Sequence, residues 1–154
     1  DLEGGAVDCM LNKDTDDSLY WHREDGALCY NLRSGRMLRY QNPRLIQGKF
    51  GNPAVKYQKP LGKNMVWTDT YGGKLCENVV QATARDIMCD ALVKLDAVGY
   101  TLVATVHDEV IIEHSYYSAD EQLEHVERIM RENEVWSTGC PLDVEGFTTV
   151  RYKK

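Results

Sequence analysis

The chain has 154 residues, of which 43% are hydrophobic and 27% are charged. This composition is typical of a soluble globular protein, and the length suffices for one domain, residues 1–154, with a sizeable core. No run approaches the roughly eighteen apolar residues of a membrane span, and residues 1–7 resemble neither a signal nor a transit peptide. We therefore expect a cytoplasmic protein. Because the first residue is Asp1 and not Met, we also expect a piece of a longer chain.

The five cysteines are odd in number and widely spaced, and no two form a C-x-x-C pair. This pattern indicates neither a disulfide framework nor a zinc site. We expect free thiols in a reducing compartment.

The net charge of −6 argues at first against a nucleic-acid partner, since affinity for phosphate comes mostly from Lys and Arg. The charge is unevenly distributed, however. Residues 33–74 carry nine basic side chains against Asp69 alone. Such a segment can form a local anion-binding face, although a solvated loop region would have the same composition. The nine are Arg33, Arg36, Arg39, Arg44, Lys49, Lys56, Lys59, Lys63 and Lys74.

The first half of the chain shows mostly strand signals after a short helix expected in residues 1–13. Residues 27–32 and 36–40 alternate in polarity, and Gly35 between them can take the positive φ that a hairpin turn requires. We expect Asn42-Pro43 to end the second of these strands.

The following segment is rich in Gly, Pro and Lys. Residues 44–64 therefore predict a loop with at most one strand, at 54–58, and residues 65–71 predict another extended stretch.

Residues 75–98 give the strongest helix signal, with Gly99 as its stop. Apolar residues recur there every three or four positions, which predicts one buried stripe. The stripe comprises Val80, Ala84, Ile87, Met88, Ala91, Leu95 and Val98.

The same helix carries a second, polar stripe. Lys74, Asn78, Gln81 and Arg85 are separated by steps of four, three and four, so they share one face if the helix begins near Lys74. Their hydrogen-bond donors could face a polar ligand together. A solvated helix face is the alternative.

A hairpin over residues 100–113 is the centre of the prediction. Two apolar, β-branched runs flank His107, Asp108 and Glu109, so three ionisable side chains stand at the bend. A pair of adjacent carboxylates is stabilised by a cation, and hard oxygen ligands suit Mg²⁺ or Mn²⁺ better than Zn²⁺. A simple polar turn is the alternative.

After this hairpin, Ser118 and Glu121 have the spacing of a capping box that opens a helix to about Asn133. Residues 142–145 and 147–152 predict a last pair of strands around Gly146. The order of elements indicates an α+β fold, with a mostly antiparallel sheet packed by a long helix and a second helix.

Four segments in one order resemble the C-terminal palm portion of the family A DNA polymerases, the DNA polymerase I family, in its phage and prophage branch. Val106-His-Asp-Glu109 resembles motif C, and Tyr71-Gly-Gly-Lys-Leu-Cys-Glu-Asn-Val-Val-Gln-Ala-Thr-Ala-Arg-Asp86 resembles the helix before it. Leu32-Arg-Ser-Gly-Arg-Met-Leu-Arg-Tyr-x-Asn-Pro43 is similar to that branch's L-P-S-G-R-x-L-x-Y-x-x-P hairpin. The segment from Gly146 onward is similar to its closing G-(x)n-R-Y-x-K tail.

The resemblance implies nucleotidyl transfer with two Mg²⁺ ions, Mn²⁺ being an alternative, on primer/template DNA and dNTP. It makes Asp108 a metal ligand, Glu109 an auxiliary carboxylate and His107 a support near the primer end. Gln81 matches a glutamine directed at the minor groove, where a donor and an acceptor together read features shared by correct pairs. The remaining DNA contacts that it implies are Arg85, Asn78, Lys74, Arg36 and Arg33.

The chain departs from the family in what it lacks. We find no D-x-S-x-x-E strand for motif A and no R-x-x-x-K-x-x-x-Y-G fingers helix. The second metal-binding Asp would come from the remainder of the polymerase chain, so we expect the fragment to be inactive alone. Glu77 stands where bacterial members have Asn, and Thr105 where many have Gln.

Two other functions stay open. A metal-dependent phosphohydrolase could use His107 and Asp108, but it needs further ligands from His22, His114 and His125. A non-catalytic nucleic-acid-binding or assembly domain is the second.

Overall fold

A computed structural model describes residues 21–49, 51–115 and 118–152. The helix expected in residues 1–13 lies outside them. The chain divides into two compact units, with the boundary between Thr83 and Ala84 inside one long helix, and each unit is described by itself. No helix in the described residues has the length and apolar character needed to cross a membrane.

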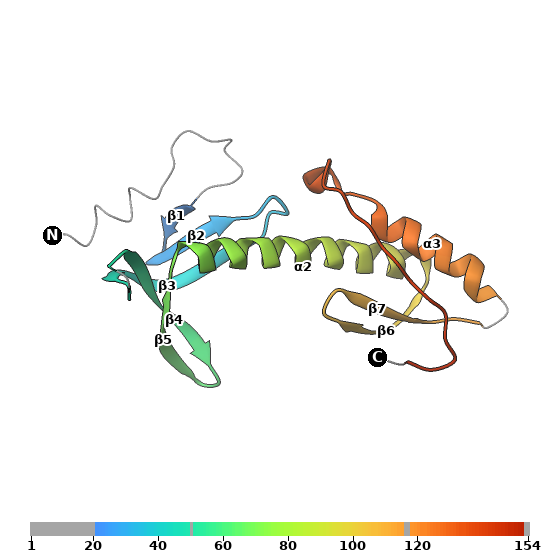
Figure 1. The fold of residues 1–154 in the computed structure, drawn as a ribbon, viewed down its shortest axis with the longest axis horizontal. Helices are drawn as coiled ribbons and strands as arrows, with labels where there is room; N and C mark the ends of the chain where they lie inside the picture. The colour runs from blue at the N-terminus through green and yellow to red at the C-terminus, as the bar shows by residue number, and fades with distance from the viewer. Residues whose placement is uncertain (1–20, 50, 116–117, 153–154) are drawn as a thin grey trace. The chain divides into compact units, whose positions relative to one another are not determined.

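The described elements confirm the α+β class with mostly antiparallel strands and two α-helices (Figure 1). In chain order they are β1 (Trp21–Glu24), β2 (Ala27–Asn31), β3 (Met37–Gln47), β4 (Pro53–Leu61), β5 (Asn64–Thr70), α2 (Gly72–Val98), β6 (Thr101–Val106), β7 (Glu109–Glu113), α3 (Ala119–Arg131) and the 3-10 helix η2 (Val135–Ser137).

The first unit is built on a five-stranded antiparallel meander in the order β1-β2-β3-β4-β5. The hairpin predicted between β2 and β3 is confirmed. Gly35 has a φ of 86°, and the Leu32 N–H donates to the Arg36 carbonyl at 2.8 Å across the turn.

Strand β3 runs past Asn42 and Pro43, so the prediction that these residues end it is wrong. The pairing with β4 shifts register between Gln41 and Arg44, and Asn42 has a φ of 49°. Pro has no N–H to give to the ladder, and a bulge accommodates this defect without ending the strand.

The strand predicted at 54–58 is confirmed as part of β4, but the loop predicted for the rest of 44–64 is wrong, because this segment also contains the end of β3 and a β4 that is longer than predicted. Strands β4 and β5 pair from Val55↔Thr70 to Leu61↔Asn64, and Gly62 in the turn has a φ of 61°. The extended stretch predicted at 65–71 is confirmed as β5. Pro60 is tolerated because β3 pairs β4 only as far as Gln58.

The core of the first unit forms where the start of α2 packs on this sheet. Leu28, Tyr40 and Leu75 are buried together, with Trp21, Leu38 and Tyr57 packed against them. The aromatic rings make direct contacts, and the Tyr40 and Tyr57 centroids are 5.0 Å apart in an edge-to-face arrangement.

Helix α2 begins at Gly72 and ends as predicted before Gly99, whose φ is 99°. The Tyr100 N–H donates to the Leu95 carbonyl at 3.1 Å, and the Gly99 N–H donates to the Asp96 carbonyl at 2.9 Å. These two bonds form a Schellman motif, in which the orphan carbonyls of the last turn find donors.

The predicted apolar stripe of α2 is only partly correct. Met88, Ala91 and Leu95 are buried, but Val80 and Val98 are 59% and 57% exposed. Near its start the helix buries Leu75 against the sheet of the first unit. Leu75 is not part of the predicted stripe, so the buried face of α2 changes along its length.

The second unit packs the β6–β7 hairpin against α3 and the end of α2. Leu95, Tyr100 and Ile129 are buried together, and Leu102, Val110, Ile112, Val126 and Met130 pack around them. The predicted helix is confirmed as α3, but the cap is not, since Ser118 makes no side-chain capping bond. The Ser118 Oγ lies 3.2 Å from His114 Nε2 instead.

The last predicted strand pair is wrong, since residues 138–152 form no strand. This segment is held on α3 without a ladder. The Gly146 N–H donates to a Glu127 carboxylate oxygen at 2.8 Å, and Arg131 donates to the Val144 carbonyl. A Cβ at Gly146 would lie 2.5 Å from Leu123 Cδ1, so a larger residue there would displace the Leu123 side chain.

We predict that Leu95→Ala lowers the free energy of unfolding of the second unit by about 2–5 kcal/mol, because it leaves a cavity at a position with no exposed surface. Urea denaturation followed by near-UV circular dichroism measures the change. Val93→Ala is the matched control on the same helix, and at 69% exposure it should cost less than about 0.5 kcal/mol. Equal losses in the two variants would contradict the assigned core.

Candidate metal and nucleic-acid site

The bend predicted between β6 and β7 is present. Val106 pairs with Glu109, so His107 and Asp108 form a two-residue turn, and His107 has a φ of 56°. Two-residue hairpin turns need positive φ, which a His or Asp tolerates better than a β-branched residue does. All three side chains at the bend are exposed, so the turn presents them to solvent.

The two carboxylates of this bend have different surroundings. The Glu109 carboxylate accepts a hydrogen bond from the Tyr152 hydroxyl at 3.4 Å. Desolvation, and then the charge of Glu109 and this hydrogen bond, raise the pKa of Tyr152 above its ordinary value, so Tyr152 remains a donor. Asp108 has no hydrogen-bond or ion-pair partner among the described residues. Its oxygens are therefore available to a cation.

The bend fits a hard divalent ion by the chemistry of its donors. Asp108 and Glu109 are consecutive and offer only carboxylate oxygens, which Mg²⁺ and Mn²⁺ prefer. Two protein carboxylates suit Mg²⁺, which keeps several waters and shares further ligands with phosphate groups.

The polar stripe of α2 has mixed surroundings. Gln81 and Arg85 are exposed. Lys74 is also exposed, but its Nζ lies 2.7 Å from a Glu77 carboxylate oxygen, and this hydrogen bond raises the pKa of Lys74. Asn78 is half-buried, and its Nδ2 donates to the Tyr40 hydroxyl at 3.1 Å. Gln81 and Arg85 are thus the members best disposed toward a ligand.

The basic segment of the first unit is partly engaged in internal contacts. Arg36 Nη2 donates to the Ala82 carbonyl at 2.8 Å, which ties the β2–β3 turn to α2. Arg39 lies 3.8 Å from Glu24, and Lys56 lies 3.7 Å from Asp69. Arg33 is exposed.

A group of possible metal ligands that the sequence analysis missed lies on β1 and β2. One donor atom each from His22, Glu24 and Cys29 falls within a span of 4.8 Å. Burial raises the pKa of the Cys29 thiol, and this effect outweighs the opposing effect of the Arg39 charge. The Arg39 guanidinium also lies 3.8 Å from the Glu24 carboxylate. This guanidinium supplies the positive charge that an ion would otherwise bring. The alternating His-x-Glu pattern before the Asp25-Gly26 turn was the available signal.

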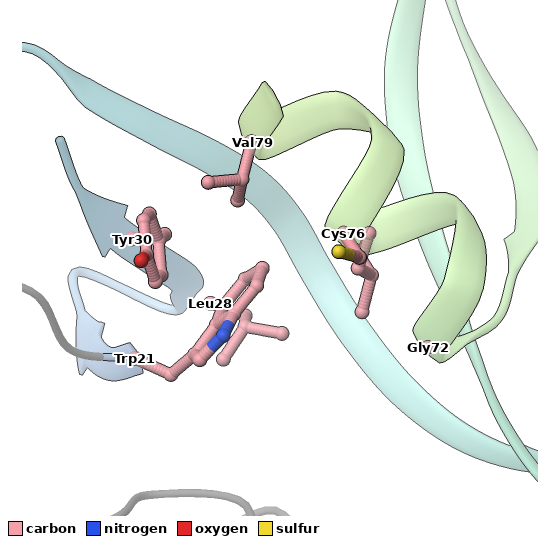
Figure 2. Close-up of a pocket in the computed structure, with 7 residues that line it drawn as sticks. Trp21, Leu28, Tyr30, Gly72, Cys76 and Val79 are labelled. Carbon is pink, nitrogen blue, oxygen red and sulfur yellow. The ribbon is translucent and has the colours of Figure 1, made fainter. Parts of the chain in front are cut away.

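An apolar pocket of ≈ 360 Å³ opens beside the start of α2 in the first unit. Figure 2 shows Trp21, Leu28 and Tyr30 facing Cys76 and Val79 across it, and Gly72 and Leu75 complete the lining. Its surface offers no group of convergent polar side chains, so it lacks the chemistry of the hairpin bend.

Comparison with known proteins adds one relative. The chain is 43% identical over 134 residues to a protein of Bacillus phage SP02, and the match covers 85% of this chain. That relative is named a DNA polymerase. The chain spans only 20% of the relative's length. No family model matches the chain, and no solved structure matches it. The match supports a relationship to a phage DNA polymerase.

We predict that the stability of the first unit falls as the pH rises above about 10, because burial raises the pKa of Tyr40. The unfolded chain then releases the tyrosine proton before the folded chain does, so the free energy of unfolding decreases. Urea denaturation at about pH 7 and about pH 10.5 measures this.

The matched variant is Tyr40→Phe, which cannot ionise. It should lose about 1 kcal/mol at neutral pH, because Asn78 loses its hydrogen-bond acceptor, and should show a smaller decrease between the two pH values. An unchanged pH dependence would contradict the role of Tyr40.

Proposed function

We propose that the chain is the C-terminal palm portion of a phage-type family A DNA polymerase, and that its β6–β7 bend supplies one carboxylate of a two-metal nucleotidyl-transfer site. The similarity to the phage polymerase carries this proposal. Because the aligned region covers 85% of the 154 residues, it includes both α2 and the β6–β7 bend whichever residue of the chain it starts from. The exposed turn and its available Asp108 agree with a motif C role.

The residues of the bend have distinct roles in this proposal. Asp108 holds the catalytic Mg²⁺, and Glu109 is an auxiliary carboxylate whose orientation Tyr152 restrains. His107 supports the turn near the primer end. When bound, Mg²⁺ lowers the pKa of the attacking 3′-hydroxyl and neutralises charge on the phosphates. Mn²⁺ is the expected substitute because it takes the same oxygen ligands.

The DNA contacts come from α2 and the β2–β3 hairpin. Gln81 offers both a donor and an acceptor to the minor groove, where correct base pairs share acceptors. Arg85, Lys74 and Arg33 are exposed cations for phosphate or groove contacts. Asn78 and Arg36 act mainly by positioning, since they bind the Tyr40 hydroxyl and the Ala82 carbonyl.

The metal site is incomplete within this chain. The sequence has no motif A strand or fingers helix, so the second Asp comes from the remainder of the polymerase. Strands β6 and β7 pair only with each other among the described residues, so each leaves one backbone edge without a partner strand there. An additional strand from the parent chain would cover such an edge. Primer/template DNA and dNTP are partners of the full enzyme.

The phosphohydrolase alternative has less support. His125 is half-buried, and its Nδ1 lies 2.7 Å from the Tyr100 hydroxyl. His114 lies against Ser118. In the part of the chain that the structure describes, the one group of three possible ligands lies at His22, Glu24 and Cys29. A non-catalytic binding domain remains the alternative that the metal experiment tests.

We predict that substoichiometric Mn²⁺ broadens the amide resonances around Asp108 and Glu109 and leaves those of His114 and His125 sharp. Asp108→Asn should reduce this broadening at least several-fold, because it removes an ionised oxygen ligand. Asp96→Asn, which neutralises an exposed carboxylate of α2, is the control and should change nothing at the bend. Broadening centred on the histidines would favour the hydrolase, and none at all would favour a non-catalytic domain.

We further predict that the purified chain extends no primer with Mg²⁺ and dNTP, because half of the metal site is elsewhere. A primer-extension assay measures this. In a polymerase restored with its upstream segment, Asp108→Asn should lower the rate by at least about 100-fold, whereas Asp96→Asn should retain it. Robust synthesis by the isolated chain would overturn the proposed division of the site.

A further inference from the structure

The end of the β4–β5 hairpin is a free ribbon. β3 pairs β4 only as far as Gln58, so residues 59–61 have β5 as their single neighbouring strand in the described sheet. The ribbon closes in a tight turn at Gly62 and Lys63, because Leu61 pairs with Asn64. Figure 1 shows this turn at the far end of the hairpin, beyond the other strands of the same sheet.

The charge of this tip has one sign. Lys59 and Lys63 are both exposed, and residues 58–66 contain no acid. The nearest acid along the hairpin, Asp69, lies 3.7 Å from Lys56. Two exposed ammonium groups on one short ribbon favour a polyanion, and the spacing of phosphates along a nucleic acid provides one.

The tip is also apolar on both of its faces. Leu61 is 65% exposed and Met65 is 49% exposed. Met65 pairs with Pro60, one position before Leu61, so the side chains of Leu61 and Met65 point to opposite faces. A ribbon that only packs on its own protein needs one apolar face. Exposed Leu and Met side chains at the end of a ribbon are of the kind that DNA-binding proteins insert as wedges between base steps.

We propose that the tip of the β4–β5 ribbon, residues 59–65, is a DNA-binding wedge: Lys59 and Lys63 contact phosphates, and Leu61 and Met65 enter between neighbouring base pairs. This inference rests on the proposed function for the choice of DNA as the polyanion. Trp67 and Arg44 brace the ribbon behind the tip. The Arg44 guanidinium lies 4.6 Å from the centre of the Trp67 ring, where the two side chains can stack.

The two parts of the wedge have separable effects. Loss of two phosphate contacts should lower the slope of log affinity against log salt by about 0.9 for each contact. Loss of the apolar side chains should leave that slope unchanged and remove the unstacking of bases. The experiment therefore compares Lys59→Ala/Lys63→Ala with Leu61→Ser/Met65→Ser in the full 154-residue chain.

Binding is measured by fluorescence anisotropy of a labelled primer/template duplex over a range of KCl concentrations. Unstacking is measured with the same duplex carrying 2-aminopurine, which brightens when it leaves the stack. We expect the lysine variant to bind roughly tenfold more weakly with a shallower salt dependence. We expect the Leu61→Ser/Met65→Ser variant to retain the salt dependence and lose most of the 2-aminopurine signal.

Arg23→Ala/Arg128→Ala is the matched control, since it removes the same charge from exposed positions outside the basic segment. It should retain both signals, and circular dichroism checks that each variant folds. Unchanged binding and unstacking in both tip variants would overturn the wedge. Failure of the unsubstituted 154-residue chain to bind duplex DNA would also overturn it. The Mn²⁺ experiment at Asp108 reads the metal site independently, so failure of the wedge and failure of the proposed function are distinguishable.

Discussion

The structure depends on a single continuous helix whose length exceeds the needs of either unit. The 27 residues of α2 contain the boundary between the units, and the helix buries Leu75 in one core and Leu95 in the other. Because each core needs its own side chains from the helix, no one stripe of α2 is apolar along its whole length. The Schellman motif at Gly99 provides donors for carbonyls in the last turn of α2.

The hairpin that follows shows how local backbone geometry presents chemistry. The chain leaves α2 through Tyr100, which is buried beside Leu95 and Ile129, and passes directly into β6. The apolar side chains of β6 and β7 hold the hairpin on α3. The two-residue turn at His107 and Asp108 is the part that no core residue covers. A short turn on an anchored ribbon keeps carboxylates exposed with little backbone freedom, which suits a metal ligand.

Much of the fold was predictable from the sequence where a single period governs the pattern. The helix ending at Gly99, the bend at residues 107–108 and the β2–β3 turn at Gly35 combine periodicity with a positive-φ residue, and all three are present. Strands at 54–58 and 65–71 were predicted, but the full length of β4 and its pairing with β5 into one long ribbon were not. Its tip is exposed on both faces, so no buried face imposes a period of two.

The candidate site residues divide in the same way into positions set by the local sequence, which were predictable, and contacts between distant residues, which were not. The position of His107, Asp108 and Glu109 at one bend between two strands is a local property, and the sequence predicted it. The contacts of Asn78 with Tyr40, of Arg36 with Ala82 and of Tyr152 with Glu109 join residues 38 to 46 positions apart. Such contacts depend on how the elements pack, and no periodicity encodes them. The group at His22, Glu24 and Cys29 likewise depends on the register of β1 against β2.

The open edges of the β6–β7 ribbon affect how this chain behaves in solution. Each of these strands has one hydrogen-bonded neighbour among the described residues, so the outward amides and carbonyls stay available for pairing. Such a surface recruits any extended peptide, including the same ribbon of a second molecule. We therefore expect this chain to self-associate in concentrated solution, and a short covering peptide that occupies the edge would keep the molecules apart.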